Sequence, residues 1–356
     1  MKQKTILYFC PNKTTFIQRD IDLLSDDYQV KAFSLKQGNP LMLIPMLAAQ
    51  FHFLVKSLWK SSLFICHFAG YSSVLPVVFG KLFRKPCLII VGGTDAAKFP
   101  KYRYGSYVKK FNGLATAFSL RHCTHILPVH ESLVFQDYTY DDGGAPAQGY
   151  TLFAPGTHKV PFTSVYYGYD AGIFKQAEGV NRKPMTFITV GNLKQKSLFI
   201  RKGYDLIIEL ARKRPELSFS LVGWDGITTI DVPANVQLLP YMNQQEIVRA
   251  FSEHEFYFQL SVMEGFPNAL CEAMLCGCIP IGSDVSGIPF IISETGYILR
   301  KRNVEELDEL IGQILENKER KKLSEAARNR ILHNFTIERR RNELKNLIVL
   351  YTTKSK

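Results

Sequence analysis

Two glutamates, Glu264 and Glu272, stand eight positions apart across a Gly-Phe-Pro-Asn turn in the second half of the chain. The apolar run 256–260 before the turn is typical of a buried strand, and the run 269–276 after it has a helical composition that Gly277 closes. We therefore expect Glu264 in the turn and Glu272 in the first turns of the helix. Carboxylates in these places can accept hydrogen bonds from the hydroxyl groups of a ligand.

The start of the expected helix adds a place for an anion. The first backbone N–H groups of a helix have no partner within it and carry a partial positive charge, so the amides of Asn268, Ala269 and Leu270 can hold a phosphate without a basic side chain. Two carboxylates beside a phosphate site fit a nucleotide sugar, with one glutamate on the sugar and the other on the ribose.

The longer pattern is similar to a known signature. Glu264-x7-Glu272, followed by Gly277-Cys-Ile-Pro-Ile-Gly-Ser283-Asp-Val-Ser-Gly287-Ile-Pro, resembles the donor site of retaining GT-B glycosyltransferases of family 4. The resemblance covers nearly all of the second half and the first half loosely. It implies an α/β chain with two Rossmann-like domains facing a cleft and a C-terminal helix that crosses back to the first domain. It also implies sugar transfer with retention of configuration, with a nucleoside diphosphate sugar as co-substrate and no other cofactor. No Asp-x-Asp follows an expected strand to hold a divalent ion, and a helix N-terminus with a lysine can replace the metal, so we expect metal-independent transfer.

The same resemblance assigns residues to the donor. Lys202, in Arg201-Lys202-Gly203, matches the lysine that binds the donor diphosphate in the family, whereas Asn192 stands where the family usually has an arginine. Arg201, Lys194 and Lys196 are candidates for the missing charge. We expect Glu264, Lys202 and Asp95 to be catalytic. The expected donor contacts are Glu272, Gly265, Phe266, Pro267, Asn268, Ala269, Leu270, Gly191, Asn192, Arg201, Gly223 and Tyr241.

The acceptor is expected on the first domain, at Arg19, His67 and Gly93. The segment 89–95 resembles a His-Gly-Ser/Thr-Asp pattern in which Gly92 replaces the histidine. Asp95 is either a ligand contact or a helix cap. His67 is either a catalytic group or a buried structural histidine, and Arg19 either meets an anionic acceptor or is a surface charge.

Short apolar runs alternate with amphipathic stretches, which favours parallel sheets with helical connections. The expected strands are 5–10, 29–33, 63–67, 87–91, 125–128, 163–166, 185–190, 218–222, 236–238, 256–260, 279–281 and 296–299. The expected domains are 1–172 and 185–335, with a helix over 336–352 that packs on the first domain. Residues 137–161 are expected to form an irregular loop or a hairpin.

Positive charge is concentrated in the first half. Residues 1–184 carry 21 Lys and Arg against 11 Asp and Glu, a net charge of +10, whereas residues 185–356 carry 23 against 21. Without a nucleic-acid-binding motif, this excess favours anionic lipid or a phosphorylated substrate over nucleic acid. The apolar segment 41–55, followed by Lys56, Trp59 and Lys60, is too short to span a bilayer. It either lies on a membrane surface or packs as a core helix.

The remaining sequence features bear on the cellular location of the protein and on alternative functions. The seven cysteines form no C-x-x-C pair and no signal-peptide pattern is visible, so we expect a cytoplasmic protein with reduced thiols. A peripheral place at the inner membrane face and a role in polysaccharide biosynthesis fit the same expectation. The first strand lacks G-x-G-x-x-G, which disfavours nicotinamide chemistry. A nonhydrolysing nucleotide-sugar epimerase and an inactive nucleotide-sugar-binding module remain alternatives.

Overall fold

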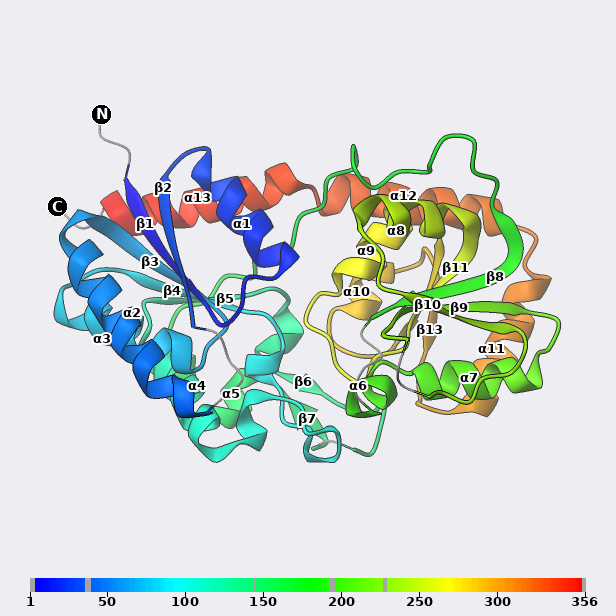
Figure 1. Cartoon of the computed structure of the whole chain (residues 1–356), viewed down its shortest axis with the longest axis horizontal. Helices are drawn as coiled ribbons and strands as arrows, with labels where there is room; N and C mark the ends of the chain where they lie inside the picture. The colour runs from blue at the N-terminus through cyan, green and yellow to red at the C-terminus, as the bar shows by residue number, and fades with distance from the viewer. Residues whose placement is uncertain (1–3, 36–39, 144, 192–195, 227–228, 354–356) are drawn as a thin grey trace. The chain divides into compact units, whose positions relative to one another are not determined.

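A computed structural model describes residues 4–35, 40–143, 145–191, 196–226 and 229–353. Its contacts divide the chain into two compact units. The first unit comprises Met1–Asp137, Ala147–Tyr166 and Glu338–Lys356, and the second comprises Tyr138–Pro146 and Tyr167–Ile337. Each unit has its own central sheet with helices on both sides (Figure 1).

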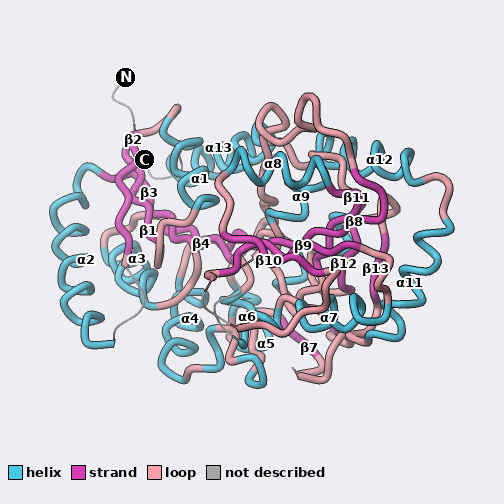
Figure 2. The backbone as a smooth tube through the Cα atoms, turned by 45° about the vertical axis from the view of Figure 1, so that its right-hand side comes forward, coloured by secondary structure: helices cyan, strands magenta, loops and turns pink. Residues whose placement is uncertain are grey.

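The first unit contains a five-stranded parallel sheet in the order β2-β1-β3-β4-β5. The strands are β1 (Thr5–Cys10), β2 (Gln29–Ser34), β3 (Ser61–His67), β4 (Cys87–Val91) and β5 (His125–Pro128). The helices are α1 (Thr15–Ser25), α2 (Leu43–Ser57), α3 (Tyr71–Leu82), α4 (Lys110–His122), α5 (Tyr150–Phe153) and α13 (Ile337–Thr353). Helices α1 and α13 lie on one face of the sheet, and α2, α3 and α4 lie on the other (Figures 1 and 2).

The second unit contains a six-stranded parallel sheet in the order β10-β9-β8-β11-β12-β13. The strands are β8 (Lys183–Val190), β9 (Ser218–Trp224), β10 (Val236–Pro240), β11 (His254–Gln259), β12 (Ile279–Ser283) and β13 (Tyr297–Leu299). The helices are α6 (Lys196–Arg201), α7 (Tyr204–Lys213), α8 (Gln244–Glu253), α9 (Asn268–Leu275), α10 (Ile288–Ile292), α11 (Val304–Glu316) and α12 (Arg320–Asn334).

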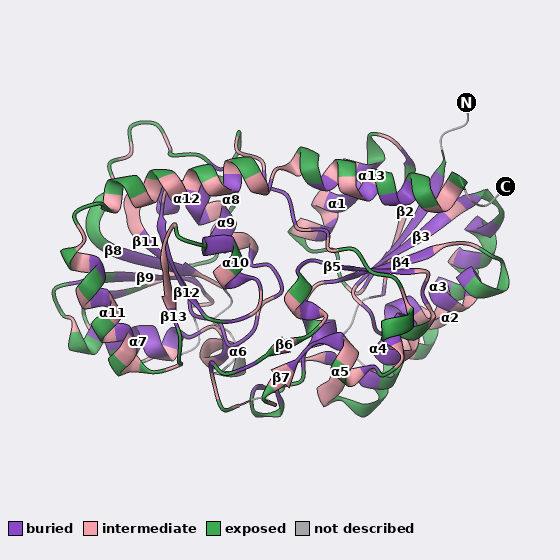
Figure 3. Cartoon of the chain, turned by 180° about the vertical axis from the view of Figure 1, so that it is seen from behind, coloured by how far each residue is buried: buried purple, intermediate pink, exposed green. Residues whose placement is uncertain are grey.

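Both cores are built on nearly continuous apolar strands, as expected for sheets covered on both faces. All six residues of β1 are buried, and Figure 3 shows the inner strands of both sheets largely as buried, whereas the edge strand β2 is largely of intermediate exposure. In the second unit the rings of Phe187, Phe219, Phe256 and Phe258 stack across three neighbouring strands, with Phe187 centroids 4.8–5.2 Å from the other three. This aromatic layer fixes the register of β8, β9 and β11.

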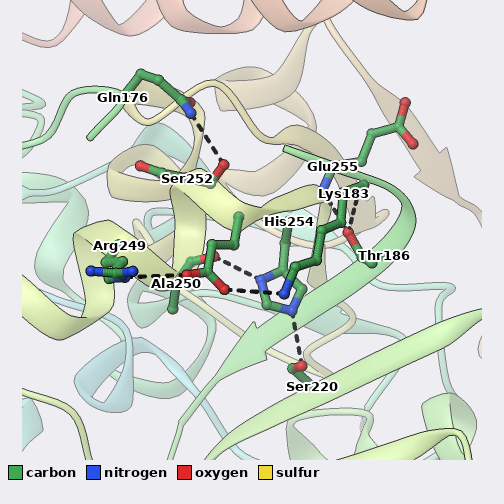
Figure 4. A network of polar contacts seen from close by, with 10 residues as sticks. Gln176, Lys183, Thr186, Ser220, Arg249, Ala250, Ser252, His254 and Glu255 are labelled. Carbon is green, nitrogen blue, oxygen red and sulfur yellow. Dashed lines mark hydrogen bonds and ion pairs between the residues drawn. The ribbon is translucent and has the colours of Figure 1, made fainter. Parts of the chain in front are cut away.

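The amino end of β11 is held by a polar network (Figure 4). The ring of His254 is hydrogen-bonded through Nδ1 to the carbonyl oxygen of Ala250 at 2.7 Å and through Nε2 to Ser220 Oγ at 2.9 Å. The backbone N–H of Glu255 donates to Thr186 Oγ1 at 3.1 Å. Burial lowers the pKa of His254, so the ring is neutral at pH 7. The network ties β11 to β8, β9 and α8, and so sets where the strand's other end lies.

The last helix returns to the first unit, where an ion pair holds it. Arg340 donates to both carboxylate oxygens of Asp20 at 2.6 Å and to the carbonyl oxygens of Val165 and Tyr166 at 3.0 and 2.9 Å. Arg340 and Asp20 are each 2% exposed. A paired and fully hydrogen-bonded charge is tolerated in a protein interior, whereas either partner alone would be strongly destabilising.

Two sequence predictions differ from the structure. Residues 163–166 do not form a strand. Thr163 and Val165 donate to the carbonyl oxygens of Ile126 and Pro128, but the ladder pairing of this segment is limited to an isolated bridge between Ile126 and Phe162. Pro128 has no N–H to donate in return, which interrupts the ladder.

The second difference concerns the predicted range 1–172 for the first domain. The strands β6 (Gln136–Asp137) and β7 (Ala147–Gln148) form a short hairpin, and Tyr138–Pro146 connects them. This connecting segment groups with the second unit instead. Tyr138 donates to the carbonyl oxygen of Val262, and Arg302 N–H donates to that of Tyr140. The boundary between the units then falls at Tyr166 and Tyr167 rather than after 172.

Candidate active site

The turn between β11 and α9 forms one side of the candidate site. The strand ends at Gln259, and α9 begins at Asn268 after Pro267, whose backbone is extended. The N–H groups of Asn268, Ala269 and Leu270 belong to the first helical turn, which has no partners within the helix for them. The buried Oδ1 atom of Asn268 has no hydrogen-bond partner within the described part of the chain. The segment therefore has the strand, turn and helix that the sequence predicts, and it presents donors at the carboxyl edge of the sheet.

Lys202 and Glu264, 62 positions apart in the sequence, form an ion pair in this turn. Glu264 Oε1 also accepts a hydrogen bond from Ser261 Oγ at 2.9 Å. Burial alone would raise the pKa of Glu264, but the charges of Lys202 and Arg201 and the hydrogen bonds from Lys202 and Ser261 outweigh it, so the pKa lies below its ordinary value. Glu264 is therefore an anion at neutral pH, next to a cation.

A row of polar side chains behind Glu264 was not predicted from the sequence. Tyr257 OH donates to Gln259 Oε1 at 3.0 Å, Gln259 Nε2 donates to Ser261 Oγ at 2.8 Å, and Ser261 reaches Glu264. Residues two apart in an extended chain point to the same side. Tyr257, Gln259 and Ser261 alternate with other residues in an apolar run, so their polar groups could have been predicted to lie on one side. Together they form the row that fixes the carboxylate of Glu264.

Lys202 is held against the same turn by backbone contacts. The N–H of Val262 donates to the carbonyl oxygen of Arg201 at 2.8 Å. Gly203, with φ of +79°, caps α7, and a Cβ there would lie 2.4 Å from the carbonyl oxygen of Leu260. Only glycine allows this approach without strain. The tight contact between the two loops explains why Lys202 and Glu264 meet, and Arg201, which is buried, lies beside them.

The other expected donor residues lie at the ends of neighbouring strands. Gly191 follows β8, Gly223 lies near the end of β9 with φ of +109°, and Tyr241, 83% exposed, follows β10. These strands are parallel, so their carboxyl ends share the edge of the sheet at which β11 ends. Asn192 and Lys194 lie outside the described residues, and the side chain of Lys196 is likewise not described. The residue that replaces the family arginine therefore stays a prediction.

The remaining residues of the Gly-Phe-Pro-Asn turn have distinct surroundings. Phe266 is 3% exposed, and its ring packs against Tyr167, Tyr169 and Phe335, with centroids 6.4, 6.5 and 5.2 Å away. Gly265 and Pro267 are buried, and Glu272 is half-buried in the second turn of α9. The side chain of Phe266 thus anchors the turn. A ligand at this turn would therefore contact the backbone of the turn rather than the Phe266 ring.

In the first unit, Asp95 is fully buried after β4. Its carboxylate accepts the backbone N–H groups of Gly92 and Gly93 on Oδ1, at 3.0 and 3.1 Å, and that of Ala69 on Oδ2, at 2.9 Å. Burial raises the pKa of Asp95 to about 6 in spite of these bonds. Gly93, with φ of +128°, makes the turn that these bonds require. The described contacts of Asp95 are those of a loop anchor, and its predicted catalytic role stays a prediction.

His67 and Arg19 lie on neighbouring elements of the same unit. His67 is 0% exposed, and its Nδ1 atom lies 2.8 Å from Tyr8 OH and 3.6 Å from Asp20 Oδ2. Burial lowers the pKa of His67 to about 3, so the ring is neutral. Arg19 is half-buried on α1. The acceptor roles of His67, Arg19 and Gly93 stay predictions.

Residues 171–330 match the family model of glycosyl transferases group 1. We call this matched part of the chain, residues 171–330, the group 1 segment. The group 1 segment covers nearly all of the second unit and contains every residue named above for the turn, the Lys202–Glu264 pair and the polar row. The family 4 assignment within this group stays a prediction.

Two curated proteins share sequence with the chain. A subunit of the phosphatidylinositol N-acetylglucosaminyltransferase of Homo sapiens is 30% identical over 125 residues, which are 32% of this chain and 26% of that protein. N-acetyl-alpha-D-glucosaminyl L-malate synthase of Bacillus anthracis is 24% identical over 186 residues, which are 49% of this chain and 48% of that protein. The chain thus spans between a quarter and a half of the length of these relatives.

Solved structures match the whole chain. Sucrose-phosphate synthase from Thermosynechococcus elongatus superposes with a TM-score of 0.77 at 14% identity, over 99% of this chain and 100% of that one. HepE from Anabaena, in complex with UDP and glucose, superposes with a TM-score of 0.70 at 14% identity, over 97% and 99%. These similarities show that the chain has the GT-B fold.

Proposed function

We propose that the protein is a retaining glycosyltransferase that moves a sugar from a nucleoside diphosphate sugar to a glycan or a lipid-linked acceptor. The observation that carries the proposal is the Lys202–Glu264 pair beside the first turn of α9, within the group 1 segment. These groups lie at the carboxyl edge of a parallel sheet. The lysine and the helix amides suit the phosphate groups of a ligand, and the carboxylate suits its hydroxyl groups.

The donor would be held by two kinds of contact. The amides of Asn268, Ala269 and Leu270 suit the diphosphate, because a helix N-terminus attracts anions. Glu272, in the next turn, suits the ribose hydroxyls, and Glu264 suits the sugar. Glu264 is ionised and fixed by Ser261, so it can accept hydrogen bonds from the sugar without first losing a proton.

The proposed reaction breaks the bond between the anomeric carbon and the diphosphate oxygen and forms a bond to an acceptor oxygen on the same face. The acceptor proton passes to the departing diphosphate. Negative charge grows on that diphosphate as the bond breaks, and Lys202 stabilises it. We propose that this happens without a bound metal ion. The described residues contain no cluster of three His, Cys, Asp or Glu that could hold a metal, and activity in the presence of EDTA tests the point.

The names of the relatives and the charge of the first half suggest which donor and which acceptor to test first. The curated relatives have names that contain N-acetylglucosaminyl or glucosaminyl, and HepE was solved with UDP, so UDP-N-acetylglucosamine is the first donor to test. The first half of the chain has a net charge of +10, which suits a phosphate-bearing acceptor such as a lipid-diphosphate-linked glycan at the cytoplasmic face of a membrane. None of the described helices is long and apolar enough to cross a bilayer.

A thermal-shift screen of UDP-, GDP- and ADP-sugars tests the donor class. A ligand at 100 times its dissociation constant adds about 2.7 kcal/mol of stability, so the true donor should stand out clearly. The best donor is then incubated with and without lipid-linked glycans, and the products are analysed. Transfer to an acceptor with retained configuration supports the proposal. Epimerised donor without acceptor, or nucleotide binding without any product, contradicts it.

A further inference from the structure

Helix α2 turns apolar side chains toward solvent. Its buried residues are Gln50, Leu54 and Ser57, two of them polar, and Gln50 donates to the carbonyl oxygen of Ser72 at 2.7 Å. The opposite side carries an exposed row that begins just before α2 and ends in the turn after it. The row consists of Leu41, Ile44, Phe51, Val55 and Trp59, which are 83%, 79%, 51%, 48% and 83% exposed. Phe53 packs inward against Phe9 and Phe33, so α2 has apolar residues on its inner side as well. The exposed apolar row is what sets it apart, because the solvent side of a surface helix is normally polar.

The apolar row continues onto the end of α3 through neighbouring aromatic rings. Phe51 lies 5.4 Å from Phe79, Phe79 lies 5.5 Å from Phe83, and Phe83 lies 6.3 Å from Trp59, all measured between ring centroids. Leu82, 70% exposed, extends the same area. We call this surface, made by the outer row of α2 with Leu82 and Phe83, the α2 face. Large contiguous apolar surfaces of this kind mark interaction sites.

The surroundings of the α2 face carry charge of one sign. Residues 28–130 contain 13 Lys and Arg and a single acidic residue, Asp95, which is fully buried. Lys56, Lys60, Lys81 and Arg84 are exposed next to the apolar row. The other side of the sheet is different, since Asp27 there pairs with Arg341 and Lys345 of α13. The chain segment that contains α2, α3 and α4 therefore has a strong excess of positive charge.

We propose that the α2 face docks on an anionic lipid bilayer, with α2 lying in the plane of the membrane surface. Apolar side chains would enter the boundary between headgroups and acyl chains, Trp59 would lie at headgroup level, and the four basic residues would meet anionic headgroups. From Leu41 to Trp59 the row is about 27 Å long at 1.5 Å per helical residue, which suits lying on a bilayer. A second copy of this chain is a poorer occupant, because pairing two such faces brings like charges together.

This inference goes beyond the sugar transfer proposed above, and vesicle binding can be measured whether or not a sugar is transferred. The full chain is sedimented with phosphatidylcholine vesicles and with vesicles that also contain phosphatidylglycerol. We expect binding only to the second, falling as salt rises, because screening shortens the Debye length from about 10 Å at 0.1 M to about 3 Å at 1 M. Equal binding to both vesicles, or to neither, overturns the proposal.

Matched variants test the face itself. The double variant Lys56→Glu/Lys60→Glu should reduce the partition coefficient at least about tenfold. Lys318→Glu/Lys321→Glu makes the same change of net charge at exposed residues of the second unit and should have no such effect. If the two double variants lose binding equally, net charge rather than the α2 face is responsible, and the proposal is wrong. Calorimetry of nucleotide binding confirms that each variant is folded.

Tryptophan fluorescence gives a second readout. The chain has two tryptophans, Trp59 and Trp224, so the variant Trp224→Phe reports on Trp59 alone. Its emission should shift to shorter wavelength with anionic vesicles and be quenched by lipids brominated near the headgroup. An unshifted emission in the bound state overturns the proposal. So does a concentration-dependent dimer that Trp59→Ala abolishes, because that result assigns the face to a second copy.

Discussion

The two units each contain a carboxylate just after a parallel strand, and the two are stabilised in different ways. Asp95, after β4, accepts only backbone N–H groups among its described contacts, and burial raises its pKa to about 6. Glu264, after β11, faces Lys202, and its pKa lies below the ordinary value. Backbone donors cannot leave without unfolding the loop, whereas a lysine side chain can turn to a ligand. The contacts of Asp95 thus favour a structural role, whereas those of Glu264 fit the ligand contact proposed for it.

The largest effect is expected at Lys202. Lys202→Ala should reduce turnover by about a hundredfold or more, because removing one electrostatic contact to a developing charge has that effect. Lys213→Ala removes an exposed lysine of α7 that pairs with Glu305, and it should leave turnover near that of the wild type. Steady-state rates with saturating donor decide the matter. If Lys202→Ala instead has turnover near that of the wild type, the stabilisation of the departing diphosphate would have to come from Arg201, Lys194 or Lys196.

Asp95→Ala should act mainly on stability. The N–H groups of Ala69, Gly92 and Gly93 would lose their acceptor, and a buried donor without a partner costs about 1–3 kcal/mol. Urea unfolding at pH 7 measures the loss, and Asp22→Ala, at an exposed position of the same unit, is the control. Unchanged stability together with a large loss of turnover would instead make Asp95 a catalytic residue.

The pH dependence separates the two carboxylates by sign. The pKa of Asp95 is raised from 3.8 to about 6, so the folded protein gains stability as the pH falls through that window, by at most about 1.4 kcal/mol per pH unit. The pKa of Glu264 is lowered, so its contribution is present above about pH 4.5 and is lost as the pH falls through the folded value. The free energy of unfolding is measured between pH 4 and 7 for the wild type and for Asp95→Asn, which has no carboxylate to protonate. As the pH falls below 6, the difference between the two should change in favour of the wild type. A difference in the free energy of unfolding that stays constant over this pH range would contradict the account.

The smallest effect is expected at Tyr138. Its hydroxyl donates to the carbonyl oxygen of Val262 at 3.0 Å, two residues before Glu264. Tyr138→Phe should lower the free energy of unfolding by about 1 kcal/mol, the usual net value of one hydrogen bond. Turnover should fall less than it does in Lys202→Ala, and nucleotide affinity should not change. A loss of turnover as large as that of Lys202→Ala would show that this contact sets the position of Glu264.

Much of the fold could be predicted because its strands are local apolar runs. The predicted bounds 5–10, 87–91 and 125–128 are confirmed by β1, β4 and β5. Residues 163–166, Thr-Ser-Val-Tyr, include β-branched and aromatic residues that favour a strand, but their neighbour Pro128 cannot complete a ladder. The grouping of Tyr138–Pro146 with the second unit depends on contacts with Val262 and Arg302, more than 100 positions away. No local pattern encodes such contacts.

The candidate site divides in the same way. The turn and helix around Glu264 and Glu272 follow from glycine, proline and helical composition, and the resemblance pointed to Lys202. The polar row was readable from the alternation of Tyr257, Gln259 and Ser261, but which carboxylate it supports depends on the packing of two loops. The burial of Asp95 could not be predicted, because a carboxylate after a strand suits a cap as well as a ligand.

The central claim is that the group 1 segment holds a nucleoside diphosphate through α9, and calorimetry of one variant tests it most directly. The nucleoside diphosphate with the largest thermal shift is titrated into the wild type, Glu272→Ala and the control Glu294→Ala, which changes an exposed glutamate of the same unit. The account predicts at least about tenfold weaker binding for Glu272→Ala, since the ribose loses a charged hydrogen-bond acceptor, and unchanged binding for the control. Equal affinity of folded Glu272→Ala and wild type would contradict it.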